Sequence, residues 1–167
     1  GDDVVDAGKA RGAGDDFILR HARRGMSPKH LRTMLDEAAV VHRNVGSFAK
    51  EIDAENYIRA SLKDPIGYKF AHYVEDGSQI RRRYYDIIDL DTGIAHEVKI
   101  GKVSNAGRAV DQSRRDSTLN AAAQRGEIDE FEQVIWDFTP RNGEVGPDEK
   151  LLKYLMENDI EYVIYLP

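Results

Sequence analysis

The spacing of apolar residues changes along the chain from a helical period to strict alternation and then back to a helical period. Apolar positions three or four apart in residues 28–41 and 47–63 predict two amphipathic helices. From Tyr68 to Ile100 apolar and polar residues alternate, and turn residues interrupt the alternation twice, which predicts three strands. This part of the chain should therefore form an antiparallel three-strand meander.

Helices and strands alternate in the C-terminal part of the chain. The pattern predicts a helix at residues 106–126, a strand at 131–138, a helix at 148–158, and a closing strand in IEYVIYLP that is apolar enough to be buried on both faces. The order of elements predicts a single α/β domain with a mixed central sheet flanked by helices.

The beginning of the chain has a different character. Residues 1–14 are rich in Gly, Ala and Asp without a sustained period, which is typical of a linker. A short helix around residues 17–24 follows, and Ser27 with Pro28 then begins the next helix. We therefore divide the chain into an N-terminal linker and helical extension, residues 1–46, and a main domain, residues 47–167.

Composition limits the classes of protein to consider. At 167 residues the chain can bury one core, it has no cysteine, and no apolar run approaches the roughly 20 residues that span a bilayer. Its first residues lack the basic start and apolar stretch of a secretory signal. The net charge is −6, yet residues 79–115 hold eight Lys or Arg against five Asp or Glu. A local basic surface for nucleic acid is therefore compatible with the acidic total.

Three charged side chains interrupt the predicted hairpin YYDIIDLDTGIAHEVKIG, which is otherwise rich in Ile, Val and Tyr. Side chains on a strand alternate between faces, so Glu97 and Lys99 share one face of the second strand. A turn centred on Thr92 sets Asp86 beside Glu97. The two carboxylates are therefore expected to converge.

Two adjacent carboxylates repel each other unless a cation lies between them, and Lys99 compensates only part of their charge. Oxygen ligands, without cysteine or a spaced histidine pair, favour Mg²⁺ or Mn²⁺ over Zn²⁺. Such an ion polarises a phosphate and lowers the pKa of a bound water, while a neighbouring ammonium orients that water or neutralises developing charge. The hairpin thus predicts a site for phosphodiester hydrolysis.

The same residues resemble a family signature. Asp86, a turn and then Glu97-Val98-Lys99 look like the PD-(D/E)XK motif of the restriction-endonuclease-like nucleases, with Tyr85 where that motif has proline. The resemblance implies that Asp86 and Glu97 bind the metal, that the Val98 carbonyl adds a ligand, and that Lys99 assists the attacking water.

The resemblance extends beyond the hairpin. The helix, meander, crossover helix and strand of residues 47–138 are similar to the family core, which implies a restriction-endonuclease-like fold and a nuclease domain within residues 47–167. Many members carry a glutamate on the first core helix, matched here by Glu55, and a glutamine on the helix after the lysine strand, matched by Gln112.

Most of the chain also resembles a wider class. Its small size, its glycine-rich beginning, HEVKIG and its C-terminal helix and strand look like toxin domains at the C-terminal ends of bacterial polymorphic toxins, including contact-dependent growth inhibition proteins. This implies action in the cytoplasm of a target bacterium after delivery within a larger secreted protein, and a cognate immunity protein. DNA is slightly favoured as substrate, and tRNA is the alternative.

Several charged residues keep two interpretations. Asp86, Glu97 and Lys99 form either a catalytic site or a structural ion cluster of a non-catalytic binding domain. Glu55 either faces a site or pairs with Arg59 along its helix.

Other polar residues are candidates for supporting roles. The run of arginines at 81–83 addresses a phosphate groove or lies on a solvated edge, and the DxD of Asp89 and Asp91 fits turn chemistry better than a second metal site. Four residues are candidates for a basic track: Lys102, Arg108, Arg114 and Arg115. The five histidines lack metal-ligand spacing and are expected at surface or packing positions, with His96 near enough to the hairpin rim to approach a phosphate.

Overall fold

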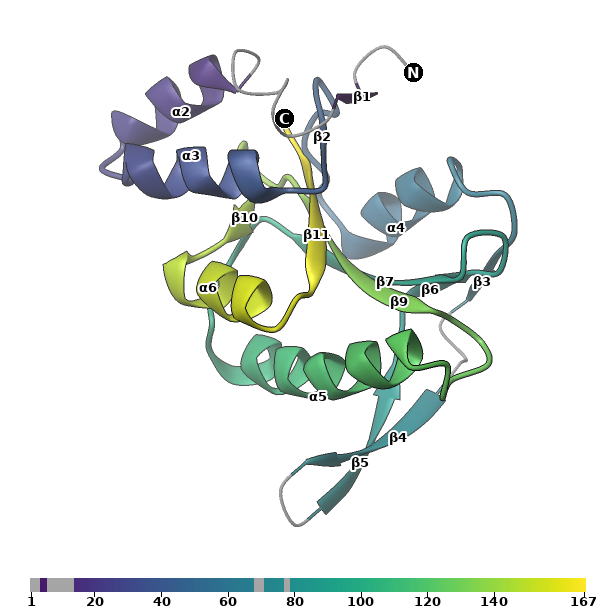
Figure 1. Ribbon diagram of the computed structural model, residues 1–167. Coiled ribbons are helices and arrows are strands. Elements are labelled where there is room, and N and C mark those ends of the chain that lie inside the picture. The colour runs from purple at the N-terminus through teal and green to yellow at the C-terminus, as the bar shows by residue number, and fades with distance from the viewer. Residues whose placement is uncertain (1–3, 6–13, 68–70, 77–78) are drawn as a thin grey trace.

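The chain folds as a mixed α/β structure, shown as a computed structural model in Figure 1. It describes residues 4–5, 14–67, 71–76 and 79–167, with side chains described for 14–67 and 83–167. A mixed sheet runs through the centre and helices cover both of its faces, as the sequence predicts. Among the described residues no helix is long and apolar enough to cross a membrane.

The central sheet combines parallel and antiparallel pairs. In sheet order the strands are β1 (Val4–Val5), β2 (Val40–His42), β11 (Glu161–Tyr165), β9 (Gln133–Thr139), β7 (Ile94–Ile100), β6 (Ile87–Asp89) and β3 (Pro65–Gly67). Neighbours in the run from β2 to β7 pair in parallel, whereas β7 with β6, β6 with β3, and β1 with β2 pair antiparallel. β11 lies between two parallel neighbours, which explains its almost uniformly apolar sequence.

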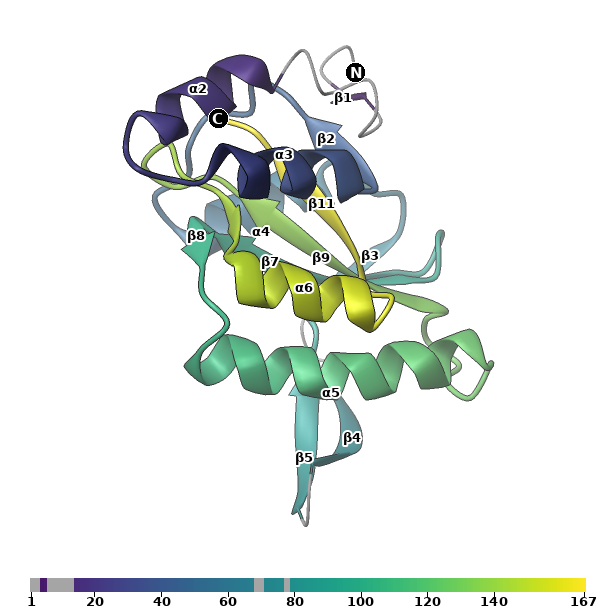
Figure 2. The ribbon, with the colours of Figure 1, turned by 60° about the vertical axis from the view of Figure 1, so that its left-hand side comes forward.

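The meander differs from its expected form. The chain leaves the sheet after β3 and makes a separate hairpin, β4 (Ala71–Asp76) with β5 (Gln79–Tyr84), before it returns as β6. This hairpin projects beyond the body of the molecule (Figures 1 and 2). The apolar and polar alternation continues without a break through residues 79–90, so it gives no sign that one predicted strand is two. A second small sheet joins β8 (Lys102–Val103) to β10 (Gly146–Pro147).

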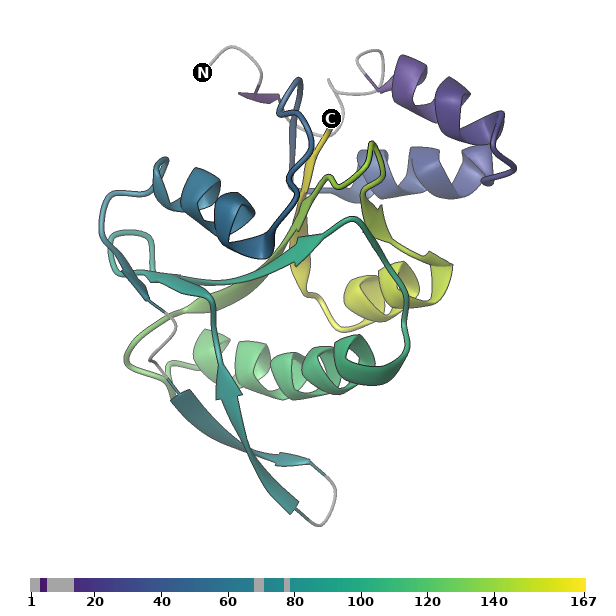
Figure 3. The same cartoon turned by 180° about the vertical axis from the view of Figure 1, so that it is seen from behind.

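Helices cover the two faces of the central sheet with different partners. α4 (Glu51–Arg59) covers one face of the sheet (Figure 3). Its Ala54 and Ile58 share a hydrophobic cluster with Ile87, Val98 and Ile135. The opposite face is covered by α2 (Asp15–Ala22), α3 (Pro28–Glu37), α5 (Gly107–Gln124) and α6 (Glu149–Glu157), whose apolar side chains share one core with Trp136 and Phe138. The two layers of helices thus enclose the charged strand β7.

Two helices are shorter than the sequence predicts. α3 ends at Glu37 because the β-branched pair at the start of Val40–His42 joins the sheet beside β11, so its predicted extension to residue 41 is wrong. α4 begins at Glu51 rather than at Ser47, whose hydroxyl instead accepts a hydrogen bond from the N–H of Gly143 at 2.9 Å.

The N-terminal region contributes to the same core as the rest of the chain. Phe17 and Leu31 belong to the hydrophobic cluster that includes Trp136, and β2 is a strand of the central sheet. The division of the chain at residue 46 stays a prediction.

Candidate functional site

The candidate site lies where the pairing of β6 with β7 stops. Ile87 is the last paired residue and faces His96, so the preceding residue, Asp86, falls beside Glu97 as the turn in the sequence predicts. Beyond that pair the Val98 N–H donates to Asp86 Oδ2 at 3.0 Å. The carbonyl of a strand residue projects to the same side as its N–H, so the Val98 carbonyl also faces the end of β6.

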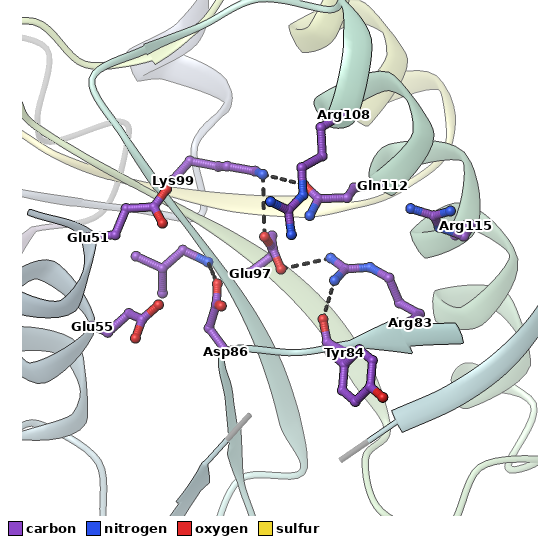
Figure 4. Close-up of a pocket in the computed structure, with 11 residues that line it drawn as sticks. Glu51, Glu55, Arg83, Tyr84, Asp86, Glu97, Lys99, Arg108, Gln112 and Arg115 are labelled. Carbon is purple, nitrogen blue, oxygen red and sulfur yellow. Dashed lines mark hydrogen bonds and ion pairs between the residues drawn. The ribbon is translucent and has the colours of Figure 1, made fainter. Parts of the chain in front are cut away.

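A pocket of about 370 Å³ opens at this point, between α4 and α5 (Figure 4). Every residue that the family resemblance selects lies in its wall, together with residues from both helices and from β5. The lining residues are Glu51, Glu55, Arg83, Tyr84, Asp86, Glu97, Val98, Lys99, Arg108, Gln112 and Arg115. The pocket therefore combines four carboxylates with four basic side chains.

Glu97 and Lys99 contact each other on the face of β7 that looks toward α5. The Lys99 ammonium lies 3.3 Å from Glu97 Oε1 and donates to the side-chain oxygen of Gln112. It also lies 5.2 Å from the centre of the Trp136 ring, on the neighbouring strand. Lys99 is thus fixed by a carboxylate, an amide and an aromatic ring, with its charge directed at the pocket.

The carboxyl groups of the pocket disfavour one another's charge. Burial, and next the Glu97 carboxylate, raise the pKa of Asp86 to about 7, and Glu55 adds to this effect. Burial also raises the pKa of Glu55, while nearby Arg59 opposes the rise. A bound cation would relieve this repulsion.

α4 forms one wall of the pocket and carries both Glu55 and Arg59. Arg59 donates to the backbone carbonyl of Asp86 at 3.0 Å and to the Asn56 side chain at 3.2 Å. Glu55 lines the pocket, and the positive charge of Arg59 acts to lower the pKa of its carboxyl group. Glu55 thus lines the pocket, and its pairing with Arg59 stays a prediction.

The donor chemistry of the site fits a hard divalent cation. Asp86 and Glu97 offer carboxylate oxygens and Val98 a carbonyl, and these are ligands that Mg²⁺ and Mn²⁺ accept. In the described part of the chain, however, no group of three or more His, Asp or Glu side chains is spaced to hold a metal as it stands. Both oxygens of Glu97 already contact cationic groups, Lys99 on one and Arg83 on the other. Metal binding stays a prediction, and it requires Glu97 to share an oxygen with one of these cations.

Sequence reasoning missed the buried pair that completes the cluster. Arg83 is one of the three arginines to which the sequence assigns either a phosphate groove or a solvated edge. It is only 3% exposed, and its Nη2 lies 2.7 Å from Glu97 Oε2. Its Nε lies 2.8 Å from Asp116, which is fully buried on α5. One signal pointed to Asp116: it follows Gln112 by four residues and so lies on the same face of the helix.

Part of the predicted basic track lines the pocket. Arg108 and Arg115 lie in its wall, whereas Arg114 makes an ion pair with Asp111 at 2.8 Å on the exposed side of α5. The side chains of Arg81, Arg82 and His72 lie outside the described residues.

Two other predictions about the hairpin are settled by its geometry. Asp89 accepts hydrogen bonds from the Asp91 N–H at 3.3 Å and the Thr92 hydroxyl at 2.9 Å, which confirms its role in the turn. His96 lies on the opposite face, buried beneath α4 and 2.6 Å from Asp137. The prediction that His96 approaches a phosphate is therefore wrong, because strand alternation turns it away from the pocket.

Comparisons of the chain with family models, with curated proteins and with solved structures find no match.

Proposed function

We propose that the chain is a metal-dependent nuclease with a restriction-endonuclease-like core. The pocket is the observation that carries the proposal. The residues that the motif selects come from the β6–β7 hairpin, from α4 and from α5, yet they line a single cavity. A chance Asp and Glu-x-Lys on a solvated hairpin would not also bring Glu55 and Gln112 to the same cavity.

The order of the elements supports the same proposal. α4 precedes the antiparallel strands β3, β6 and β7, and α5 then crosses over to β9, which pairs with β7 in parallel. This is the order of helix, meander, crossover helix and strand that the family resemblance implies. The inserted β4–β5 hairpin lies between β3 and β6 and leaves that order intact.

In this proposal Asp86, Glu97 and the Val98 carbonyl hold Mg²⁺ or Mn²⁺. The ion would polarise the scissile phosphate and lower the pKa of a water. Lys99, fixed by Glu97 and Gln112, places its ammonium where it can donate to that water or to a phosphate oxygen. Its charge would then offset the charge that develops on the phosphate.

The substrate in this proposal is a nucleic acid, with DNA slightly favoured and tRNA as the alternative. Arg108 and Arg115 lie in the wall of the pocket and can contact phosphates on either side of the scissile bond. By its resemblance the domain is a toxin that acts in the cytoplasm of a target bacterium and is neutralised by an immunity protein. Induced expression in a bacterium should stop growth for the wild type and not for Lys99→Ala.

The direct test is a cleavage assay on purified protein. Plasmid DNA and total RNA are incubated with wild type in Mg²⁺, in Mn²⁺ or in EDTA, beside Glu97→Gln and Lys99→Ala. Asp91→Asn, an exposed carboxylate of the same hairpin, is the matched control. We expect metal-dependent cleavage by wild type and control, and rates lower by about 100-fold or more in the two site variants. Cleavage that persists in EDTA, or that Glu97→Gln leaves unchanged, would refute the proposal.

One observation favours a second candidate, a binding domain without catalysis. Glu97 is already neutralised by Arg83 and Lys99, so the cluster can be stable without a metal. In that case neither nucleic acid is cut in any metal. Glu97→Gln then lowers the free energy of unfolding, and its only effect is on stability because the wild type has no nuclease activity.

A further inference from the structure

Arg83 is enclosed by partners that use all three nitrogens of its guanidinium. Nε and Nη2 lie 2.8 and 3.0 Å from the two oxygens of Asp116, Nη2 also lies 2.7 Å from Glu97, and Nη1 donates to the carbonyl of Tyr84. The guanidinium carbon is 4.5 Å from the centre of the Tyr85 ring. A planar fork with five donors can make such a set of bonds, whereas a lysine ammonium cannot span them.

Asp116 is a built anchor for this arginine. It is fully buried, and besides Arg83 it accepts hydrogen bonds from the Tyr85 hydroxyl at 2.6 Å and the Trp136 indole N–H at 2.8 Å. With four donors on two oxygens, the carboxylate has one orientation that satisfies all of them. Asp116 therefore fixes the position of Arg83 from α5.

The fixed guanidinium in turn fixes Glu97. Arg83 takes Oε2, and Oε1 is the oxygen that Lys99 approaches at 3.3 Å (Figure 4). Glu97 is 4% exposed, and without Arg83 its side chain would have no other described partner for Oε2. The carboxylate thus presents one oxygen to the lysine and the pocket while the other is withheld.

We propose that Arg83, anchored by Asp116, is a positioning residue that orients Glu97 for metal binding and holds it beside Lys99. The inference rests on the proposed function, because it assigns Arg83 a part in that same site. Arg83 acts through Glu97 and does not contact the substrate. Since Arg83 lies near the end of β5, its side chain connects the projecting hairpin to the site.

The first test compares Arg83→Lys with Arg125→Lys. Arg125 makes a forked ion pair with Glu127 on the surface, at 2.8 Å, and so controls for loss of such a pair away from the pocket. Mn²⁺ affinity is measured from the free-ion signal in electron paramagnetic resonance, and kcat and KM for nucleic acid are measured separately. Loss of a residue that supports a metal ligand typically costs 10- to 100-fold in affinity or rate. We expect that loss in Mn²⁺ affinity and kcat for Arg83→Lys, with KM within about twofold of wild type, and no loss for Arg125→Lys.

The second test is chemical rescue. Arg83→Ala leaves a space that lines the open pocket, and millimolar guanidinium should raise its kcat at least about fivefold. Ammonium at the same ionic strength should not, because it lacks the planar fork. If Arg83→Ala does not fold, Arg83→Lys decides the question.

The outcomes separate the two proposals. Wild type that binds no Mn²⁺ and cuts neither nucleic acid overturns the proposed function. Wild type that binds and cuts, with Arg83→Lys unchanged in both, overturns the positioning role alone. A rise in KM without a change in Mn²⁺ affinity also overturns it, because Arg83 would then bind substrate.

Discussion

Replacing Asp86 by Asn should stabilise the protein in the absence of metal, and the gain should depend on pH. The folded state raises the pKa of this carboxyl from its ordinary 3.8 to about 7, through burial first and the Glu97 carboxylate second. Above pH 7 the folded protein must therefore keep an ionised Asp86 in a place that disfavours its charge. Asparagine removes that charge, and its carbonyl can still accept the hydrogen bond from the Val98 N–H.

The sign and size of the effect follow from linkage. A carboxyl whose pKa is raised on folding destabilises the folded state increasingly as pH rises from 3.8, its ordinary pKa, to about 7, its pKa in the folded state, so roughly a third of the cost is present at pH 5 and all of it at pH 9. A shift of roughly three pH units corresponds to an upper limit of about 4 kcal/mol. Asp86 is partly accessible to solvent and shares its charge repulsion with Glu55, so we expect Asp86→Asn to gain about 1 to 3 kcal/mol at pH 9 and less than about 1 kcal/mol at pH 5.

Urea unfolding in EDTA, followed by circular dichroism at the two pH values, measures this difference. Asp91→Asn, on the exposed turn of the same hairpin, should change little at either pH. Mg²⁺ should then stabilise wild type and not Asp86→Asn, since a ligand that binds only the folded state raises its stability. Equal differences at pH 5 and pH 9, or a variant less stable than wild type at pH 9, would refute the electrostatic account of the pocket.

Two further predictions concern stability away from the pocket. Burial alone would lower the pKa of His96, but Asp137 raises it overall, so the ion pair stabilises the protein below about pH 6.5 and stabilises it less as pH rises. Asp137→Asn should therefore lower the free energy of unfolding in urea by about 3 to 5 kcal/mol at pH 5.5 and by about 1 to 2 kcal/mol at pH 9. Equal losses at the two pH values would contradict this. Gly146→Ala would place Cβ 2.3 Å from the sulfur of buried Met34 at φ 106°, so it should lower the free energy of unfolding by at least about 2 kcal/mol more than Gly143→Ala, where φ is 76° and the space is open.

The sequence predicted the hairpin of the candidate site because its information is local. Strand alternation and a short turn are enough to place Asp86, Glu97 and Lys99 together, and the observed register agrees. The two helices that carry Glu55 and Gln112 were predicted too, although α4 begins four residues later than its expected start at Ser47.

The Arg83 and Asp116 pair is not local, and this is why it was missed. The two residues are 33 positions apart and meet because α5 packs against both β9 and the projecting hairpin. Alternation along residues 79–90 is compatible with one long strand, whereas in the structure its first part, β5, pairs with β4 and its last part, β6, pairs with β3. Likewise, Val40 and Val41 extend a helical pattern but gain more as a strand beside β11.

The position of Trp136 gives the pocket a built-in optical reporter. It is the only tryptophan in the sequence, it is fully buried, and its indole N–H is bonded to Asp116 while the Lys99 ammonium lies over its ring. The emission of an excited indole shifts with the charges beside it. When tryptophan alone is excited, the emission maximum therefore reports the charges at this one site. Binding of an ion or a phosphate can then be followed by fluorescence in unlabelled protein and in real time.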